Sequence, residues 1–269
     1  MPGVYDAISA RAAAASGAEA LYLSGAGVTN SSLAVPDIGL MSLTELMWQA
    51  SRVCAAAGLP VISDVDTGFG EAWNVARTVL EAERAGLAGI HLEDQVNPKR
   101  CGHLDGKQVT EPEEMAKKIR AAVDTREDLF IVARTDTRSV EGLDAAIERG
   151  KRYADAGADG VFPEGLESEG EFEAFRRGVK GPLMANMTEF GKTPLISASR
   201  FAELGYEMVI FPMTGFRLML KALCDGYAEL VRTGTQAGLM DRMKTRKELY
   251  ELLGYAEYSE KDADWSGRG

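Results

Sequence analysis

Short apolar segments alternate with longer amphipathic stretches along most of this chain. The apolar segments are continuous and bounded by polar or turn residues, which is typical of strands buried on both faces of a parallel sheet. We expect eight strands, at residues 3–5, 20–23, 60–63, 89–92, 129–133, 160–162, 182–185 and 208–211. The stretches between them have helical spacing. We expect helices that include residues 72–85, 111–123, 140–156 and 198–204.

Glycine residues mark the ends of several predicted helices. Gly86, Gly157 and Gly205 each follow a helical stretch and precede the next strand, a position that favours a glycine cap. Eight strand–helix units in 269 residues predict one domain, residues 1–269, with the fold of a (β/α)8 TIM-type barrel. A doubly wound open sheet is the alternative. Few residues precede Asp6, so the first strand is either short or lacks upstream residues.

The pattern changes after residue 212. Long helical stretches at 216–232 and 239–253 replace the alternation of strands and helices. No segment rich in Pro, Ser or Gly separates them from the barrel. We therefore expect a helical C-terminal extension over residues 216–258.

Composition and charge limit the classes of partner. The chain is 45% hydrophobic and 26% charged, with a formal net charge of −11, which argues against nucleic acid or an anionic membrane as a partner. It has no long apolar run and no basic leader followed by an apolar segment, so we expect neither a membrane span nor a secretory signal. The widely spaced Cys54, Cys101 and Cys224 indicate free thiols and a cytoplasmic location.

Acidic residues follow two neighbouring predicted strands. Asp64 and Asp66 end the third strand, and Glu93 and Asp94 end the fourth. Catalytic groups of such barrels lie at the C-terminal ends of the strands, and residues two apart on a strand face the same way. Converging carboxylates repel one another unless a cation neutralises them, and their oxygens suit Mg²⁺ or Mn²⁺. Helix capping and solvation are the structural alternative.

Two arginines follow other strands. Arg134 ends the fifth strand and Arg217 follows the eighth. A guanidinium group binds a carboxylate in a two-pronged fork, so a metal with these arginines predicts a small di- or tricarboxylate substrate. A structural ion pair with the nearby acids is equally consistent with either arginine.

The segment Ser24-Gly25-Ala26-Gly27 follows the second strand. Its glycines would let backbone N–H groups approach a substrate carboxylate. It is a weak match to a dinucleotide-binding fingerprint, because Asn30 stands at the place of the third glycine.

The polar segment 99–107 cannot be a core element, because its charged groups would be buried without partners. Cys101 lies here among Lys99, Arg100 and His103. Nearby positive charge lowers the pKa of a thiol and favours its use as acid, base or nucleophile. We therefore predict that Cys101 is catalytic.

Lys99-Arg100-Cys101-Gly102-His103 resembles the signature loop of the isocitrate lyase/phosphoenolpyruvate mutase superfamily. Similar motifs span nearly the whole chain: residues 22–25, 64–70, 74–79, 91–95, 133–136, 162–164 and 185–191. The Cys-Gly-His loop marks the carbon–carbon lyase branch, and the run from Asn186 to Phe190 is most similar to that of the 2-methylisocitrate lyases.

This resemblance implies roles for individual residues. It implies Mg²⁺ bound by Asp64, Asp66 and Glu93, largely through water, and catalytic roles for Cys101, His103, Arg134 and Glu164. It also implies substrate contacts from Ser24, Gly25, Ala26, Gly102, Asn186, Thr188, Arg217 and Arg246.

The implied reaction is a retro-aldol cleavage of 2-methylisocitrate to pyruvate and succinate. Cys101 would protonate the succinate carbanion, while the general base stays open. Segment 97–107 would act as a lid. The superfamily is typically homotetrameric, with C-terminal helices exchanged between subunits. Related enzymes acting on dimethylmalate, citramalate or oxaloacetate are the alternative, ahead of a phosphonopyruvate enzyme or a non-catalytic binding protein.

Overall fold

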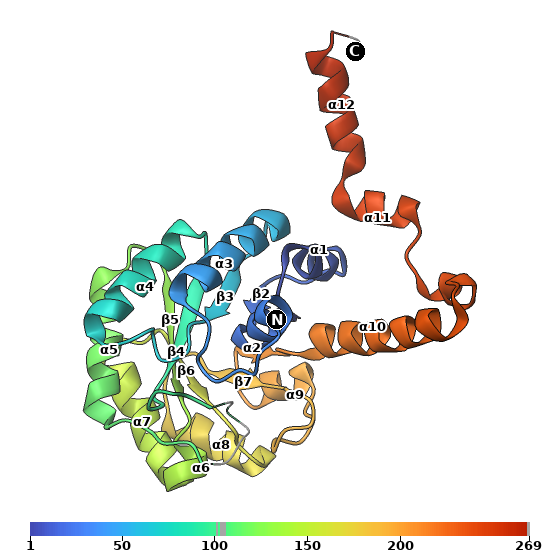
Figure 1. Cartoon of the computed structure of the whole chain (residues 1–269). Helices are drawn as coiled ribbons and strands as arrows, with labels where there is room; N and C mark the ends of the chain where they lie inside the picture. Colours follow the sequence, from blue (N-terminus) through green and yellow to red (C-terminus); the bar gives the residue numbers. More distant parts are fainter. Residues whose placement is uncertain (101, 103–105, 268–269) are drawn as a thin grey trace.

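The computed structural model describes residues 1–100, 102 and 106–267, and its main body is a barrel of parallel strands surrounded by helices (Figure 1). All eight predicted strands are present, and the prediction of a (β/α)8 barrel is confirmed. The strands are β1 (Gly3–Val4), β2 (Leu21–Leu23), β3 (Val61–Asp64), β4 (Gly89–Glu93), β5 (Phe130–Thr135), β6 (Gly160–Pro163), β7 (Met184–Asn186) and β8 (Met208–Ile210).

The barrel consists of two hydrogen-bonded parts. Strands β1 to β6 form one parallel sheet in chain order, and β7 pairs with β8. Single parallel bridges close the two seams, one between Val161 and Leu183 and the other between Pro2 and Phe211. The C-terminal ends of all strands therefore meet at one end of the barrel.

The helices largely follow the sequence prediction. Those within the barrel region are α1 (Ala7–Ala15), α2 (Gly25–Val28), the π-helix η1 (Thr29–Leu33), α3 (Leu43–Ala57), α4 (Ala72–Arg84), α5 (Pro112–Thr125), α6 (Arg138–Glu141), α7 (Leu143–Asp155), α8 (Glu169–Gly178) and α9 (Ala198–Glu203). The predicted helix 140–156 is interrupted at Gly142, whose φ of +95° is incompatible with an α-helix.

Apolar side chains fill the space on both sides of the strands. Inward-facing residues of most of the strands pack inside the barrel, among them Tyr22, Ile62, Val132, Phe162 and Met184. A larger cluster lies between β1–β5 and their helices, and a separate one lies between β6–β8 and theirs. The strands are buried on both faces, as their continuous apolar sequences require.

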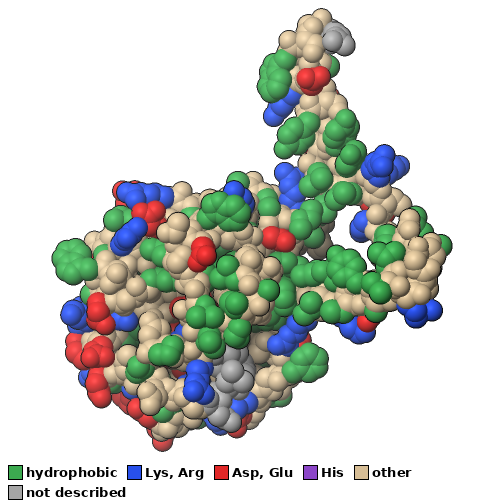
Figure 2. Space-filling view, in the orientation of Figure 1, with side chains coloured by type: hydrophobic (Ala, Val, Ile, Leu, Met, Phe, Trp, Pro, Cys, Tyr) green, Lys and Arg blue, Asp and Glu red, His purple; other side chains and the backbone are tan. Residues whose placement is uncertain are grey.

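The C-terminal region extends away from the barrel. It contains α10 (Thr214–Thr233), the 3-10 helix η2 (Ala237–Arg242), α11 (Arg246–Leu253) and α12 (Tyr255–Trp265). Figure 1 shows α10 projecting outward before the chain turns back, and Arg11 of α1 donates a hydrogen bond to the carbonyl of Leu252. Hydrophobic side chains are exposed along this arm (Figure 2).

These exposed residues include Leu218, Leu223, Tyr227, Val231, Tyr250 and Tyr258. The predicted helix 239–253 is divided in two between η2 and α11. Within the described part of the chain, no helix has the length and apolar character needed to cross a bilayer.

Candidate active site

Polar side chains form a layer directly above the apolar interior of the barrel. Successive side chains of a strand point to opposite faces, so the residue two positions after an inward-facing one also faces inward. The inward residues of the lower layer are Tyr22, Ile62, His91, Val132, Phe162 and Met184. Two positions later in each strand come Ser24, Asp64, Glu93, Arg134, Glu164 and Asn186. These six positions are far apart in the sequence, but the periodicity of the strands brings their side chains into one layer.

His91 belongs to the floor of this site. Its Nε2 lies 2.8 Å from the hydroxyl of Tyr22, and its ring stacks on that tyrosine and meets the edge of Phe162. Burial, with a contribution from Arg134, lowers the pKa of His91 to about 3. The imidazole is therefore neutral near pH 7 and acts as a packed polar core residue.

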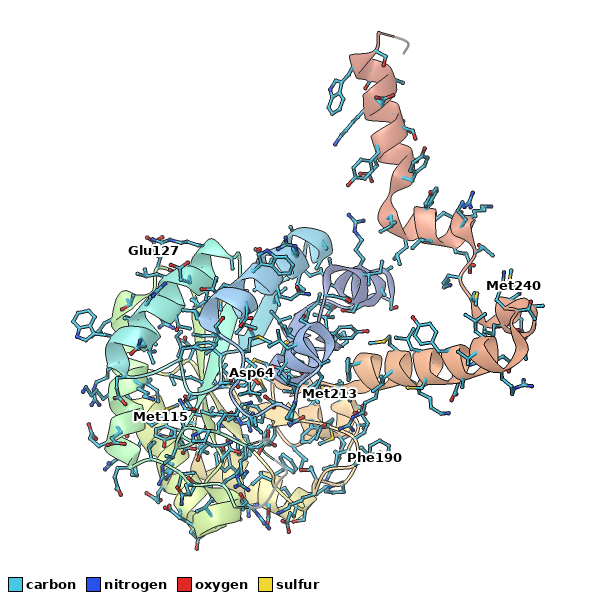
Figure 3. The ribbon with its side chains drawn as sticks, viewed as in Figure 1. Asp64, Met115, Glu127, Phe190, Met213 and Met240 are labelled. Atoms are coloured by element: carbon cyan, nitrogen blue, oxygen red, sulfur yellow. The ribbon has the colours of Figure 1, made fainter. Side chains whose placement is uncertain are left out.

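A cavity opens at the C-terminal ends of the strands. It encloses about 460 Å³ of empty space, part of which is open to solvent. Asp64 and Met213 both line it, although they are far apart in the sequence; both are labelled in Figure 3. The other lining residues are Tyr22, Ser24, Ala26, Asp37, Lys99, Gly102, Arg134, Phe162, Glu164, Asn186, Thr188 and Pro212.

Lys99 joins carboxylates from two loops. Its ammonium group lies 2.7 Å from Asp66 Oδ1 and donates a hydrogen bond to Asp37 Oδ1. Burial raises the pKa of Asp66 to about 6, with Lys99 opposing this shift. Burial also raises the pKa of Asp64, again opposed by Lys99. The carboxylates therefore converge as predicted from their positions, and a lysine supplies part of the neutralising charge.

The prediction that Asp64 and Asp66 share one strand face was wrong. β3 ends at Asp64, and Asp66 has a φ of +49°, in the left-handed region. The backbone N–H of Asp66 donates to Asp64 Oδ1 at 2.9 Å. This bend, rather than strand alternation, holds the two carboxylates close together.

Arg134 lies between three acids. Its Nε and Nη2 donate to the two carboxylate oxygens of Asp136 at 2.9 and 3.1 Å. Its Nη1 lies 3.2 Å from Glu93, and its Nη2 lies 3.3 Å from Glu164. Although burial acts the other way, Asp136, Glu93 and Glu164 hold the pKa of Arg134 well above its usual value. Arg134 therefore forms structural ion pairs and also lines the cavity, and its role as an anion clamp stays a prediction.

Glu164 and Asn186 connect the next two strands. Asn186 Nδ2 donates to Glu164 Oε2 at 3.0 Å, and the N–H of Gly165 donates to Glu164 Oε1 at 2.8 Å. The backbone of Gly102 packs directly against Arg134 and Glu164: an added Cβ there would lie 2.5 Å from both Arg134 Nη2 and Glu164 Cγ. Only glycine fits at this position without movement of its neighbours.

The carboxylates fit a hydrated magnesium ion better than a dry metal cluster. Among the described residues, no three His, Cys, Asp or Glu side chains form a ready-made metal site. With the residues that the structure describes, neither carboxylate oxygen of Glu93 forms a hydrogen bond, although both are buried. Burial also raises the pKa of Glu93 well above its usual value. Mg²⁺ commonly keeps several waters and uses one or two protein carboxylates. Asp64, Asp66 and Glu93 fit that mode of binding.

Asp94 is not part of this carboxylate group, contrary to the sequence prediction. Its oxygens accept hydrogen bonds from Thr135, Tyr153 and the backbone N–H of Asp136. Arg149 of α7 also contacts it. Asp94 follows Glu93 directly, so it points to the opposite face of the strand, where it joins β5 to the helical layer.

Of the predicted residues that the structure describes, five do not line the cavity: Gly25, Asp66, Glu93, Arg217 and Arg246. Gly25 lies behind it, and an added Cβ there would be 2.8 Å from Asp64 Oδ2. Arg217 donates to the carbonyl of Glu189 and is partly exposed on α10. Arg246 is exposed at the start of α11. Cys101 and His103 lie outside the described residues.

Sequence reasoning missed three contributors to the cavity. Asp37 lies in an irregular loop without a strand end or motif to draw attention to it. Lys99 was interpreted only as part of the charged surroundings of Cys101. Met213, whose sulfur accepts a hydrogen bond from the Ser24 hydroxyl at 3.5 Å, also has no polar sequence signal.

Comparison with known proteins shows which family this chain resembles. The family model described as phosphoenolpyruvate phosphomutase matches residues 1–231. A 2-methylisocitrate lyase of Aeropyrum pernix is 55% identical over 265 residues, covering 98% of this chain and 86% of the relative. The similarity therefore includes both the barrel and the C-terminal helices.

Solved structures of similar fold belong to related enzymes. A crystal structure of 2,3-dimethylmalate lyase, described as a PEP mutase/isocitrate lyase superfamily member, has a TM-score of 0.93 and 37% identity, covering 98% of this chain and 89% of its own. Phosphonopyruvate hydrolase in complex with oxalate and Mg²⁺ has a TM-score of 0.86 and 27% identity, with coverages of 97% and 92%.

Proposed function

Because the chain belongs to the phosphoenolpyruvate phosphomutase family, we propose that it is a Mg²⁺-dependent carbon–carbon lyase that cleaves 2-methylisocitrate to pyruvate and succinate. The observation that carries this proposal is the 55% sequence identity between this chain and a 2-methylisocitrate lyase, over 98% of this chain. The cavity supports it, because buried carboxylates suited to a hard cation stand beside the buried cation Arg134.

Asp64, Asp66 and Glu93 would hold the magnesium ion. When bound, the ion would stabilise the negative charge that develops on the pyruvate half during cleavage. Arg134 is anchored by Asp136 and Glu93, so its guanidinium is held in place before the substrate arrives. Preorganised charge of this kind needs little rearrangement during the reaction.

The substrate would occupy the space between the two sides of the cavity. Ser24, Gly25 and Ala26 would contact the end that becomes pyruvate. Asn186, Thr188 and Gly102 would contact the remaining carboxylates, with Arg217 and Arg246 as further candidates. For these two arginines, binding would require the side chain to move or a neighbouring subunit to supply it.

A proton must also be delivered to the succinate carbanion. We assign this step to Cys101 as general acid, with His103 beside it in sequence. Segment 97–107 would act as a lid that excludes water. A Cys101→Ser variant would then keep its affinity for a small dicarboxylate but lose turnover, whereas unchanged turnover would remove Cys101 from the mechanism.

The decisive experiment measures product release with Mg²⁺ and with EDTA: pyruvate from 2-methylisocitrate, 2,3-dimethylmalate and citramalate, glyoxylate from isocitrate, and oxalate from oxaloacetate. We expect metal-dependent release with the highest kcat/KM for 2-methylisocitrate, and succinate as the second product. Absence of turnover on all five would refute the lyase proposal.

A second candidate is a lyase for a smaller acid. The similarity to 2,3-dimethylmalate lyase over nearly the whole fold favours it. In this case 2,3-dimethylmalate would be the preferred substrate, and analysis of the second product would find a monocarboxylic acid in place of succinate. The carboxylate site would keep the same role.

The assembly that we propose is a cytoplasmic homotetramer with C-terminal helices exchanged between subunits. The exposed apolar side chains of α10 to α12 support this, because such a surface on an extended arm is typical of an interface. Light scattering on the purified protein would test the tetramer, and a monomeric mass would contradict it.

A further inference from the structure

Lys107 is a buried cation at the end of the segment 97–107. Its side chain is only 1% exposed. Its ammonium group donates to the backbone carbonyl of Gly102 at 2.5 Å and to Asp136 Oδ1 at 2.7 Å. Burying a charged ammonium group is costly unless it is paired and hydrogen-bonded. These two partners therefore define where the Lys107 side chain is stable.

Asp136 is shared between two cations. Its Oδ1 accepts from both Lys107 and Arg134, and its Oδ2 accepts from Arg134 Nε. Its backbone N–H donates to the buried carboxylate of Asp94 at 2.9 Å. Although burial acts the other way, Arg134 and Lys107 hold the pKa of Asp136 below its usual value. An ionised, fully bonded carboxylate thus lies between the cavity arginine and Lys107.

Gly102 connects the same bridge to the cavity. Its backbone packs so closely on Arg134 and Glu164 that no Cβ fits between them. Its carbonyl is the group that Lys107 binds. The position of Gly102 over the cavity and the orientation of Arg134 therefore depend on one buried cluster.

We propose that Lys107 is a positioning residue, which bridges the Gly102 carbonyl and the Asp136 carboxylate and so fixes Gly102 and Arg134 relative to each other. The proposal rests on the proposed lyase function only where turnover is measured. Lys107 does not line the cavity, and it acts through these two neighbours. The competing explanation is that Lys107 merely stabilises the fold.

The first test compares Lys107→Met with Arg126→Met. Arg126 forms an ion pair with Asp159, just before β6 and therefore at the opposite end of the barrel. Each variant loses one side of an ion pair. We expect kcat/KM of Lys107→Met to fall by about 100-fold, the cost of roughly an ångström of misplacement. Arg126→Met should lose stability while keeping wild-type kcat/KM. Equal activity of the two variants would overturn the proposal.

A double variant tests whether the bridge acts as a unit. If Lys107 works through Asp136, adding Lys107→Met to an Asp136→Asn protein should change kcat/KM little, because residues that act together are not additive. Multiplication of the two separate losses would instead show independent roles and would overturn the bridge.

Two further measurements separate this proposal from the lyase function. Oxalate with Mg²⁺ serves as a probe for calorimetry, and we expect about ten-fold weaker binding to Lys107→Met because the site loses its preorganisation. Amide hydrogen exchange needs no ligand, and Gly102 should exchange faster in Lys107→Met than in wild type or Arg126→Met. Wild-type exchange at Gly102 would refute the positioning role even if no acid proves to be a substrate.

Discussion

Replacing Gly102 with alanine tests the geometry of the cavity directly. An added Cβ would lie 2.5 Å from Arg134 Nη2, 2.5 Å from Glu164 Cγ and 2.8 Å from Glu164 Cδ. Unstrained carbon contacts are at about 3.5–4.0 Å. The overlap is therefore roughly one ångström, and it occurs against two different side chains.

Neither neighbour can move away without breaking other interactions. Arg134 is bonded to Asp136 and paired with Glu93, and Glu164 is bonded to Asn186 and Gly165. The backbone of Gly102 must move instead. A displacement of about 1 Å at an active site can cost about 100-fold in rate. Because a loop can shift at lower cost than a packed core, we expect the free energy of unfolding to fall by only about 1 kcal/mol, at the low end of overpacking penalties.

The measurements are kcat/KM for pyruvate release and the free energy of unfolding from urea titration. Gly170→Ala is the matched control, because an added Cβ on α8 meets only Ser168 Oγ at 3.9 Å. It should keep wild-type activity. Wild-type kcat/KM in the Gly102→Ala enzyme would refute the close packing of this residue on Arg134 and Glu164.

Four other changes have defined outcomes. His91 has a folded pKa of about 3, lowered chiefly by burial, against about 6.5 when unfolded, so its stabilising contribution is complete above pH 6.5 and is lost as the pH falls towards 3. Between pH 7 and about pH 4.5, urea titration should show His91→Gln losing about 3 kcal/mol less stability than wild type, and parallel losses would contradict this. Arg134→Met leaves three buried carboxylates without their shared cation and should lower the free energy of unfolding by about 3–5 kcal/mol; an unchanged urea midpoint would be inconsistent with these pairs. Burial raises the pKa of Asp66 to about 6, so protons should compete with Mg²⁺ below that pH. Calorimetry should find Mg²⁺ binding about ten-fold weaker for each pH unit below 6. A Mg²⁺ affinity that does not change with pH would exclude Asp66 as a ligand. Val231 on α10 is 86% exposed, and Val231→Glu should reduce the oligomer mass in light scattering if this apolar face is an interface, so an intact oligomer would remove Val231 from it.

The barrel could be predicted from sequence because each strand is a continuous apolar run. Gly86, Gly157 and Gly205 follow predicted helices and have φ values of +86°, +104° and +82°. These positive values confirm that each glycine ends its helix. Positions after the strands also identified Asp64, Arg134 and Glu164 as neighbours. Local patterns were sufficient here because the closed barrel brings every strand end to one place.

Other features depend on information that local patterns lack. Glu93 and Asp94 look equivalent in sequence, yet only the strand register decides which one points into the barrel towards Arg134. Asp37 reaches the site from an irregular loop, and its partner Lys99 comes from a segment far along the chain. The periodicity of the sequence predicts one continuous helix over residues 140–156, but Gly142 interrupts it. In each case the outcome depends on long-range packing.

The two seams of the barrel divide the cavity as well as the sheet. Asp64, Glu93, Arg134 and Glu164 lie on or directly after the strands of the six-stranded part, whereas Asn186 lies on the two-stranded part. A single bridge joins the two parts at each seam, and one hydrophobic cluster extends from β6 to the two-stranded part across the seam between them. One hydrogen bond of the cavity, from Asn186 Nδ2 to Glu164 Oε2, crosses the seam between β6 and β7. An acid bound between Arg134 and Asn186 would therefore contact both parts of the barrel, a charged group on the six-stranded part and an uncharged amide on the two-stranded part.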